Sequence, residues 1–159
     1  MDIIKIDFDS LKKENWSDQE TENAELILDF VQNIMNNHDF DYIRRVYNNG
    51  EYVQHNRNMP DGISGVIETV AQLAKRFPDF TYDVKQILAD GEYVMFHSHA
   101  TVSKKHRGND KKGFNITDTW QVIDGKIVEH WDSIQPIDGL MRFNALLTGG
   151  AIRNPNGVF

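Results

Sequence analysis

Asp118 is the residue whose surroundings in the sequence point most directly to chemistry. It is the one charged side chain on an alternating strand face that otherwise presents Phe114, Ile116, Trp120 and Val122. A carboxylate in apolar surroundings needs hydrogen-bond partners. If this face lines a pocket, desolvation raises the carboxyl pKa toward the range of a general acid or base. A structural carboxylate, bonded to a histidine or to a backbone N–H, explains the pattern equally well.

Two further acid–base candidates, His130 and Asp132, lie on the next expected strand, beyond an Asp124-Gly125 turn. Their position relative to Asp118 depends on the hairpin register, because a slip of one residue moves every side chain to the opposite face. A two-residue turn sets Asp118 opposite Trp131 and points Asp132 away from it.

A three-residue turn gives the other register, in which Val122 pairs with Lys126. Asp118 then lies opposite His130, and Asp132 shares their face. The pattern of apolar residues fits both registers. We predict the second, in which Asp118, His130 and Asp132 project to one side of the sheet and form an acid–base cluster.

Two histidines, His97 and His99, share one face of another expected strand, which is the arrangement used by a metal site or a proton relay. Gly91 precedes them at the spacing that opens the cupin metal motif. The glutamate of that motif is missing, and Lys104 stands near its place. We therefore expect His97 and His99 to line a pocket and to bind substrate, and we expect no metal.

Four more residues are candidates for substrate binding, three because they lie together in a short polar run and one because it lies beside Asp118. Tyr52, His55 and Asn56 follow the second expected helix and are placed at a pocket mouth. A histidine in such a run more often makes hydrogen bonds than carries out catalysis. Trp120 lies beside the pocket if the clustered register holds, although a tryptophan is more often a core residue.

The elements that position these residues change type once along the chain. Helical spacing predicts helices over 17–36, about 40–50 and 63–77, the last of them stopped by Pro78. A period of two then predicts strands over 80–84, 92–103, 114–123 and 126–135. Helices followed by strands indicate an α+β fold.

Length and composition limit the classes of function. The 159 residues predict one domain over 1–159, with an N-terminal extension over 1–16 and a C-terminal tail over 137–159. The chain has no cysteine, which excludes disulfides and thiolate chemistry and favours the cytoplasm. A net charge of −7 disfavours nucleic acid and membranes as partners. The basic run over 104–112 is interrupted by glycine and is expected to be a solvated loop.

The run from Asp118 to Asp132 resembles the closing hairpin of SnoaL-like polyketide cyclases, within the nuclear transport factor 2-like superfamily. Tyr52-Val-Gln-His-Asn56 and His97-Ser-His99 resemble a bacterial branch predicted to catalyse aldol condensation. The likeness spans about residues 20–136. It implies a cone of helices and a strongly curved antiparallel sheet around one pocket, and it implies a homodimer.

The resemblance also implies roles for individual residues. In the cyclases the aspartate after a His-Trp pair is the acid/base, which assigns that role to Asp132. The family commonly has a histidine fourteen residues earlier, where this chain has Asp118. Two carboxylates could still divide the acid and base duties. His130 is the third candidate proton carrier.

Three functions are consistent with these observations. The first is a cofactor-free lyase or isomerase that removes a proton next to a carbonyl, as the resemblance implies. The second is a non-catalytic binder of a small apolar or aromatic ligand, which needs only the pocket. The third is a metal-dependent enzyme that uses His97, His99 and a carboxylate. We expect the first, acting on a small molecule without a cofactor.

Overall fold

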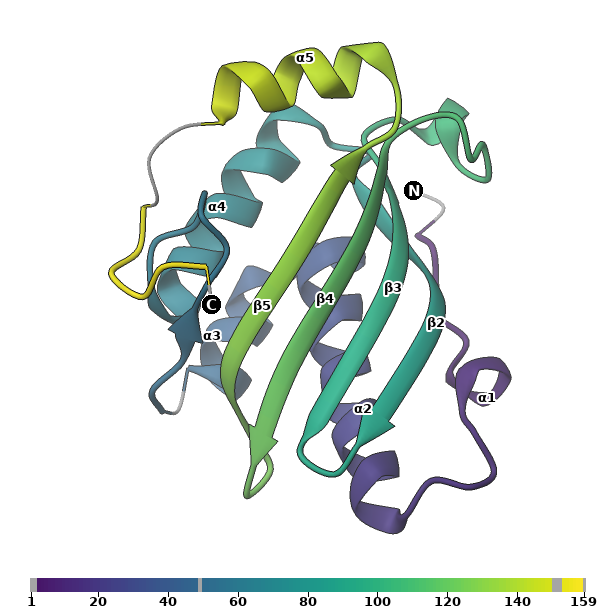
Figure 1. The fold of residues 1–159 in the computed structure, drawn as a ribbon, viewed down its shortest axis with the longest axis vertical. Coiled ribbons are helices and arrows are strands. Elements are labelled where there is room, and N and C mark those ends of the chain that lie inside the picture. The colour runs from purple at the N-terminus through teal and green to yellow at the C-terminus, as the bar shows by residue number, and fades with distance from the viewer. Residues whose placement is uncertain (1–2, 49, 150–152, 159) are drawn as a thin grey trace.

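The structure, a computed structural model, describes residues 3–48, 50–149 and 153–158. Its helical elements are α1 (Phe8–Leu11), α2 (Asp18–Val31), the π-helix η1 (Gln32–Asn37), α3 (Phe40–Tyr47), α4 (Gly62–Arg76), the 3₁₀-helix η2 (Lys104–His106) and α5 (Gly139–Thr148). Its strands are β1 (Val53–Gln54), β2 (Thr81–Asp90), β3 (Tyr93–Thr101), β4 (Phe114–Ile123) and β5 (Lys126–Pro136). Figure 1 shows α2, α3 and α4 behind the sheet and α5 across one end of the strands. The fold is α+β, as predicted.

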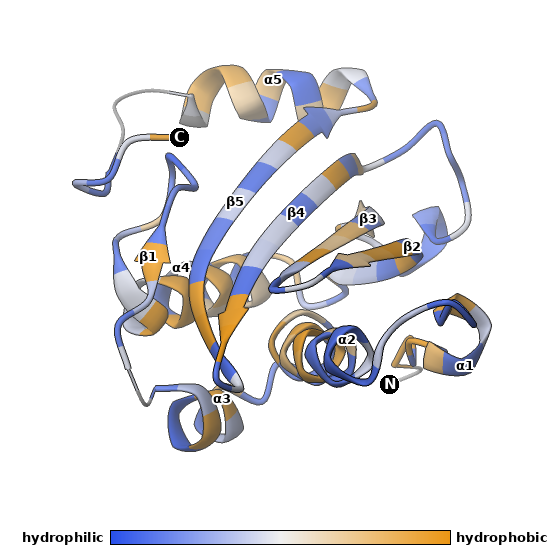
Figure 2. Ribbon diagram, turned by 60° about the horizontal axis from the view of Figure 1, so that its bottom comes forward, coloured by the Kyte–Doolittle hydropathy of each residue, from blue (hydrophilic) through white to orange (hydrophobic). Residues whose placement is uncertain are grey.

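The strands form one curved sheet that does not close into a barrel, in the order β1-β5-β4-β3-β2. Strands β2 to β5 pair antiparallel with their neighbours. The short edge strand β1 pairs with β5 in parallel, so the expected all-antiparallel sheet is corrected at this edge. The direction follows from the chain path, because β1 comes from α3 and continues toward α4 without forming a hairpin with β5 (Figure 2).

Helix α2 begins at the capping box that the sequence predicts. The Ser17 hydroxyl accepts from the Glu20 N–H, and the Glu20 carboxylate accepts from the Ser17 N–H at 2.7 Å. Helical winding then continues as η1, where the buried Asn36 reaches the sheet. Its side chain accepts from the Tyr82 N–H at 2.7 Å and donates to the Tyr82 carbonyl at 3.0 Å. The π-turn thus ties the helical layer to β2.

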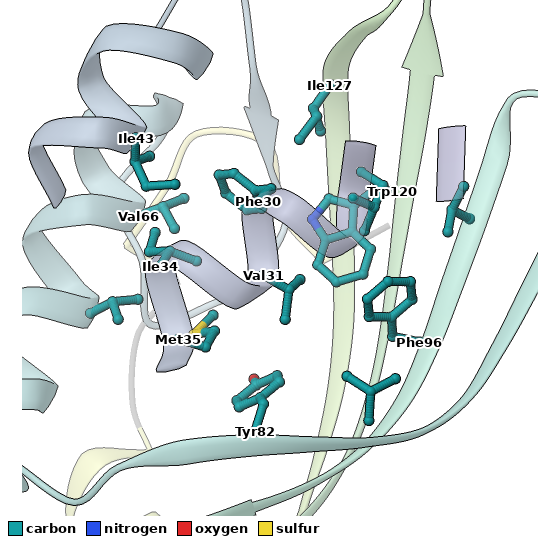
Figure 3. Packing of buried hydrophobic residues seen from close by; sticks show 14 of the residues in the cluster. Phe30, Val31, Ile34, Met35, Ile43, Val66, Tyr82, Phe96, Trp120 and Ile127 are labelled. Carbon is teal, nitrogen blue, oxygen red and sulfur yellow. The ribbon is translucent and has the colours of Figure 1, made fainter. Parts of the chain in front are cut away.

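The hydrophobic core lies between this helical layer and the concave face of the sheet (Figure 3). Phe30, Ile34 and Ile43 come from the helices, and Phe96 and Trp120 come from β3 and β4; all five are at most 2% exposed. Burying a side chain of this size contributes roughly 1.5–3 kcal/mol. The apolar spacing of the predicted helices marks the residues of this core correctly.

Helix α5 lies in the weakly patterned segment that is expected from the sequence to be a C-terminal tail. The Asp138 carboxylate caps it by accepting from the N–H groups of Leu140 and Met141 at 3.0 and 3.3 Å. Met141 is buried, but Leu140, Phe143 and Leu147 are exposed. Because apolar side chains lie on the outer side as well, the segment lacks the one-sided pattern that reveals a helix.

The loop over 104–112 contains only η2 and turns, as expected for the basic run. Within the described residues, no helix has both the length and the apolar character that crossing a membrane requires.

Candidate functional site

The β4–β5 hairpin takes neither of the two registers weighed from the sequence. Asp124 and Gly125 have φ of 50° and 68°, which is typical of a two-residue type I′ turn. Ile123 therefore pairs with Lys126, and the predicted pairing of Val122 with Lys126 is wrong.

A β-bulge then restores the clustered face. The pairing shifts by one residue because Val128 has no partner on β4. Beyond it Trp120 pairs with His130, and Asp118 pairs with Asp132. Since residues two apart share a face, Asp118, His130 and Asp132 project to the same side of the sheet. The predicted clustering is confirmed, and its cause is the bulge.

A chain of hydrogen bonds defines the protonation of the His130 ring. The Gln54 side-chain oxygen accepts from the Asn56 N–H at 2.8 Å, which fixes that atom as an acceptor. It also lies 2.9 Å from His130 Nδ1, which must therefore carry a hydrogen. His130 Nε2 faces Asp118 Oδ1 at 3.1 Å. Two lone pairs cannot bond at this distance, so a proton lies between Asp118 and His130, on one partner or the other.

Burial favours the protonated form of Asp118. Asp118 is 2% exposed, and its desolvation raises the carboxyl pKa from the ordinary 3.8 to about 6. The bond to His130 opposes the rise, and the nearby Asp132 carboxylate adds to it. The second oxygen of Asp118, Oδ2, is buried and has no hydrogen-bond partner among the described residues. It is a free polar atom that a ligand group could engage.

Asp132 is more exposed than Asp118 and is held by a residue of the segment that follows β1. Its Oδ2 accepts a hydrogen bond from the Asn56 side-chain amide, and its Oδ1 takes no part in that bond. Asn56 is 3% exposed and is held in turn by Asn154, whose amide donates to the Asn56 carbonyl at 2.9 Å. The tail therefore supports the residue that orients Asp132.

Aromatic rings flank the His130 imidazole from the β4 side and from the β1 side. Trp120 stacks on it from β4 at a centroid distance of 5.1 Å, and Tyr52 stacks on it beside β1 at 6.5 Å. Burial raises the pKa of Tyr52 well above its ordinary value, and the negative charges of Asp118 and Asp132 raise it further. Its phenol therefore keeps its proton and can act only as a neutral hydrogen-bonding group.

These residues form the polar end of a cavity of about 850 Å³ between the helices and the concave face of the sheet. The volume lies within the usual range for small-molecule sites. Most of the remaining wall is apolar: Phe30, Met35, Val66, Val70, Leu73, Phe77, Phe80, Tyr82, Phe114 and Ile116. Asn144 of α5 and Arg153 and Val158 of the tail also border it.

His97 and His99 lie on the opposite face of the sheet, so their expected place in the pocket is corrected. They pair with Thr117 and Asn115 of β4, out of phase with Asp118. His97 Nε2 contacts the Asn115 side chain at 2.6 Å, and His99 Nε2 contacts the Lys112 carbonyl at 2.7 Å. Neither borders the cavity. Alternation on β3 predicts which residues share a face but does not reveal which face is concave.

His55 borders the cavity, as do Tyr52, Asn56 and Trp120, but its imidazole is already engaged. Its Nε2 lies 2.8 Å from the Glu129 carboxylate, and its ring stacks on Trp131 at 5.1 Å. Glu129 and Trp131 alternate with His130 and Asp132 along β5 and face away from the cluster. His55 thus links the segment after β1 to β5 through Nε2, while its buried Nδ1 has no hydrogen-bond partner among the described residues.

Sequence reasoning missed Gln54, which is fully buried and bonded to His130. A signal was present, because Gln54 lies within the run from Tyr52 to Asn56 that was singled out. Its importance depends on the parallel pairing of Gln54 with His130, which brings together residues far apart in the sequence.

The same cluster is the place where the described residues could hold a metal ion. One ligand atom from each of Asp118, His130 and Asp132 can be chosen so that the three lie within 4.8 Å of one another. One nitrogen and two carboxylate oxygens suit several divalent cations. The metal hypothesis therefore moves from His97 and His99 to these residues.

The geometry agrees with a comparison of the sequence to protein families. The model of the SnoaL-like polyketide cyclases matches residues 25–141, which is more than half of the chain. The chain belongs to this family. The match includes both the run from Tyr52 to Asn56 and the β4–β5 hairpin, so all residues of the polar cluster lie within the matched range.

Solved structures resemble this SnoaL-like chain at the level of the fold. A protein named as a candidate polyketide cyclase from Bacillus cereus is 22% identical, with a TM-score of 0.64 over 86% of this chain and 88% of that one. AclR from Streptomyces galilaeus, named as a candidate hydroxylase, is 20% identical, with a TM-score of 0.58 over 82% and 86%. An NTF2-like protein of unknown function from Cytophaga hutchinsonii is 13% identical, with a TM-score of 0.53 over 72% and 90%.

The fold is therefore NTF2-like, as the resemblance implied. Among curated proteins none matches the sequence significantly. Membership of the SnoaL-like polyketide cyclase family indicates action on a small molecule, of the cyclase kind.

Proposed function

We propose that this protein is a cofactor-free acid–base enzyme that moves a proton next to a carbonyl group, in an aldol-type cyclisation or a related isomerisation. The observation that carries the proposal is the pair Asp118–His130, which shares one proton in an enclosed site directly opposite a second carboxylate, Asp132. An acid and a base of this kind, held on one face, are what enolisation requires.

In the proposed reaction Asp132 is the base. Asn56 holds one of its oxygens, which leaves the other to remove the proton from the carbon next to the substrate carbonyl. The C–H bond breaks, and its electron pair forms the enol double bond. The proton shared by Asp118 and His130 passes to the carbonyl oxygen, so that the enol is neutral.

The enol carbon then attacks a second carbonyl of the same molecule and forms the new C–C bond. The second carbonyl oxygen takes the proton from Asp132, and the enol O–H returns its proton to the Asp118–His130 pair. Atoms and electrons balance without an oxidant or reductant. In an isomerisation the enol is instead protonated again at carbon.

Hydrogen exchange tests this proposal before a physiological substrate is known. Aromatic methyl ketones and 1,3-diketones would be incubated with the protein in D₂O, and the loss of their α-protons followed by NMR. We expect catalysed exchange by the native protein and its loss in Asp132→Asn. The matched control is His97→Gln, because His97 is exposed on the other face of the sheet. Ligands that bind without exchange would support the binding-protein function instead.

A metal-dependent hydrolase or lyase is the second candidate, favoured by the closeness of Asp118, His130 and Asp132. In that case the three side chains would hold a divalent cation that polarises the substrate carbonyl as a Lewis acid. Elemental analysis of protein purified without chelators separates the two candidates, since only this one requires a stoichiometric metal.

We further propose that the protein works as a homodimer in the cytoplasm. The family resemblance supports the pairing, and the exposed Leu140, Phe143 and Leu147 of α5 offer an apolar surface that a second copy could cover. The lack of cysteine supports the location. Light scattering of Phe143→Glu beside the native protein tests the first point, because a dimer that uses α5 should then dissociate.

A further inference from the structure

A turn over residues 154–157 brings the end of the described chain back to the segment that carries Gln54 and Asn56 (Figure 1). Its two asparagines form one unit, because the Asn154 side-chain oxygen accepts from the Asn156 N–H at 3.0 Å. This unit, the C-terminal turn, lies outside residues 25–141, so the family match assigns it no role.

The first asparagine of the C-terminal turn holds the backbone of Asn56. Asn154 is 8% exposed, and its amide donates to the Asn56 carbonyl at 2.9 Å. The Asn56 side chain donates in turn to Asp132 Oδ2. Because the bond from Asn154 fixes the backbone from which this side chain projects, it limits the directions that the Asn56 amide can take. Asn154 therefore acts on the candidate base through one intermediate residue.

The second asparagine holds Gln54 on the edge of β1 that faces away from β5. Backbone groups on such an edge need partners. The Asn156 amide donates to the Gln54 carbonyl at 3.1 Å, and the Asp61 carboxylate accepts from the Gln54 N–H at 2.9 Å. The same carboxylate accepts from the Asn156 amide at 2.8 Å. Gln54 is thus held at both backbone groups while its side chain bonds to His130.

Asp61 makes these bonds in place of the one that its position predicts. It is the N-cap residue of α4, where an aspartate usually accepts from the first N–H groups of the helix. Its side chain makes no such bond. The helix gives up a stabilising cap, and the carboxylate holds Gln54 and Asn156 instead. Departures of this kind from a local rule are expected where a site is being positioned.

We propose that Asn154 and Asn156 are positioning residues of the acid–base site. The first sets the amide that bonds to Asp132, and the second sets the side chain that keeps the His130 hydrogen on Nδ1. That this positioning serves proton transfer rests on the proposed function. The hold on the two side chains does not depend on turnover and can be measured in the resting protein.

NMR of ¹⁵N-labelled protein tests both contacts without a substrate. The native protein should show a protonated Nδ1 for His130 and a downfield side-chain amide proton for Asn56, because both are hydrogen-bonded. We expect Asn154→Ala to move the Asn56 signal toward that of a solvated amide. Asn156→Ala should give a mixture of His130 tautomers.

The hydrogen-exchange assay tests the consequence for proton transfer, with the aromatic methyl ketone 2-acetonaphthone as the probe. Asn154→Ala and Asn156→Ala should each lower the exchange rate of the bound probe by roughly 3- to 10-fold, the change in population that one lost hydrogen bond produces. The affinity for the probe, measured by calorimetric titration, should stay nearly unchanged, because neither asparagine borders the cavity.

Asn23→Ala is the matched control for Asn154→Ala. Asn23 is 7% exposed, and its amide donates to the Gly91 carbonyl at 3.0 Å, so each variant removes one buried amide bonded to a backbone carbonyl. Asn23 does not border the cavity. Its variant should lower the thermal midpoint about as much, yet keep the exchange rate and the Asn56 signal. Asn154→Gln retains an amide donor and should recover part of the loss.

Two results would overturn the proposal. One is a folded double variant, Asn154→Ala with Asn156→Ala, that keeps both NMR signals. The other is an equal fall in the exchange rate in Asn23→Ala and Asn154→Ala, which would show only a general loss of stability. If the native protein catalyses no exchange but the variants lose the two NMR signals, the proposed function fails and the positioning stands.

Discussion

Asp118 and Asp132 lie directly opposite each other on β4 and β5, although the two-residue turn that joins these strands would by itself place them on different faces. The bulge at Val128 brings them to the same face, because it adds one residue to β5 between the turn and the site. Two carboxylates in directly paired positions repel each other when both are ionised, which favours keeping a proton on the Asp118–His130 pair. The hairpin thus builds both the geometry of the site and its protonation.

Asp132→Asn should abolish proton transfer while leaving the fold intact. The amide keeps the size of the side chain and can still bond to Asn56, but it cannot take up a proton. General acid–base groups typically contribute ~10²- to 10⁴-fold, so the rate of α-proton exchange in D₂O should fall by about that factor. Thermal unfolding checks that the fold is retained.

Asp118→Asn and His130→Gln, measured in the same exchange assay, assign the remaining roles. A loss comparable to that of Asp132→Asn marks a direct proton carrier, whereas a smaller loss marks a group that orients or tunes Asp132. Full exchange activity in a folded Asp132→Asn protein would contradict the role that the family resemblance gives to this residue.

The elements were predictable from the sequence where one periodicity governs a long segment. The apolar spacing of α2 and α4 and the alternation of β3, β4 and β5 each reflect burial against one core, so the pattern carries the information. Edge strand β1 has only two residues, and α5 exposes much of its apolar surface, so neither leaves such a pattern.

The site was predictable in its residues and less so in its geometry. Asp118 stood out because a charge on an apolar face is rare, and that signal is local. The bulge at Val128 and the contact of Gln54 with His130 are set by tertiary pairing, which no local spacing encodes. The misplacement of His97 has the same origin, since both faces of β3 carry apolar residues and either could have been concave.

Removal of metals should leave the protein unchanged. Each of Asp118, His130 and Asp132 already has at least one hydrogen-bond partner, from His130, Gln54 or Asn56, so an ion is not needed to hold the three side chains in place. We expect EDTA treatment and dialysis to alter neither the exchange rate nor the thermal midpoint. Restoration of lost activity by added Zn²⁺, Mn²⁺ or Fe²⁺ would instead favour the metal-dependent candidate.

Gln54→Leu should impair catalysis through His130 without filling or closing the cavity. The side-chain oxygen of Gln54 holds the hydrogen of His130 on Nδ1, so its loss frees the ring to take the other tautomer. Histidine ¹⁵N NMR should show a protonated Nδ1 in the native protein and a mixture in Gln54→Leu. The exchange rate should fall, whereas the affinity for 2-acetonaphthone should change by no more than about twofold. A change of that size is smaller than the loss of one hydrogen bond to the ligand would cause.

Gln54→Glu supplies the matched control, because it keeps an oxygen acceptor at the same place. It should retain the Nδ1–H signal. If Gln54→Leu also keeps that signal and full exchange activity, Gln54 has only a structural role in satisfying the Asn56 N–H.

Asp118→Asn should make the protein more stable at neutral pH even as it impairs catalysis. The folded pKa of Asp118, about 6, lies above its ordinary 3.8, so the folded state holds a proton that the unfolded chain releases between these values. Stability therefore falls as the pH rises from about 4 to 6. An asparagine cannot ionise, and its amide N–H can donate to His130 Nε2 in place of the shared proton, so the variant avoids this loss.

The expected gain above pH 7 is about 1–3 kcal/mol in the free energy of unfolding, which corresponds to roughly 2–4 °C in the thermal midpoint per kcal/mol. Near pH 4 the gain should vanish, because the native Asp118 is then protonated in the folded protein as well. Scanning calorimetry of both proteins across this range checks the sign. If the gain in stability is the same at pH 4 and pH 8, it comes from packing and not from the ionisation of Asp118. If the gain instead grows toward low pH, the pKa of Asp118 lies below 3.8 and the shared proton resides on His130.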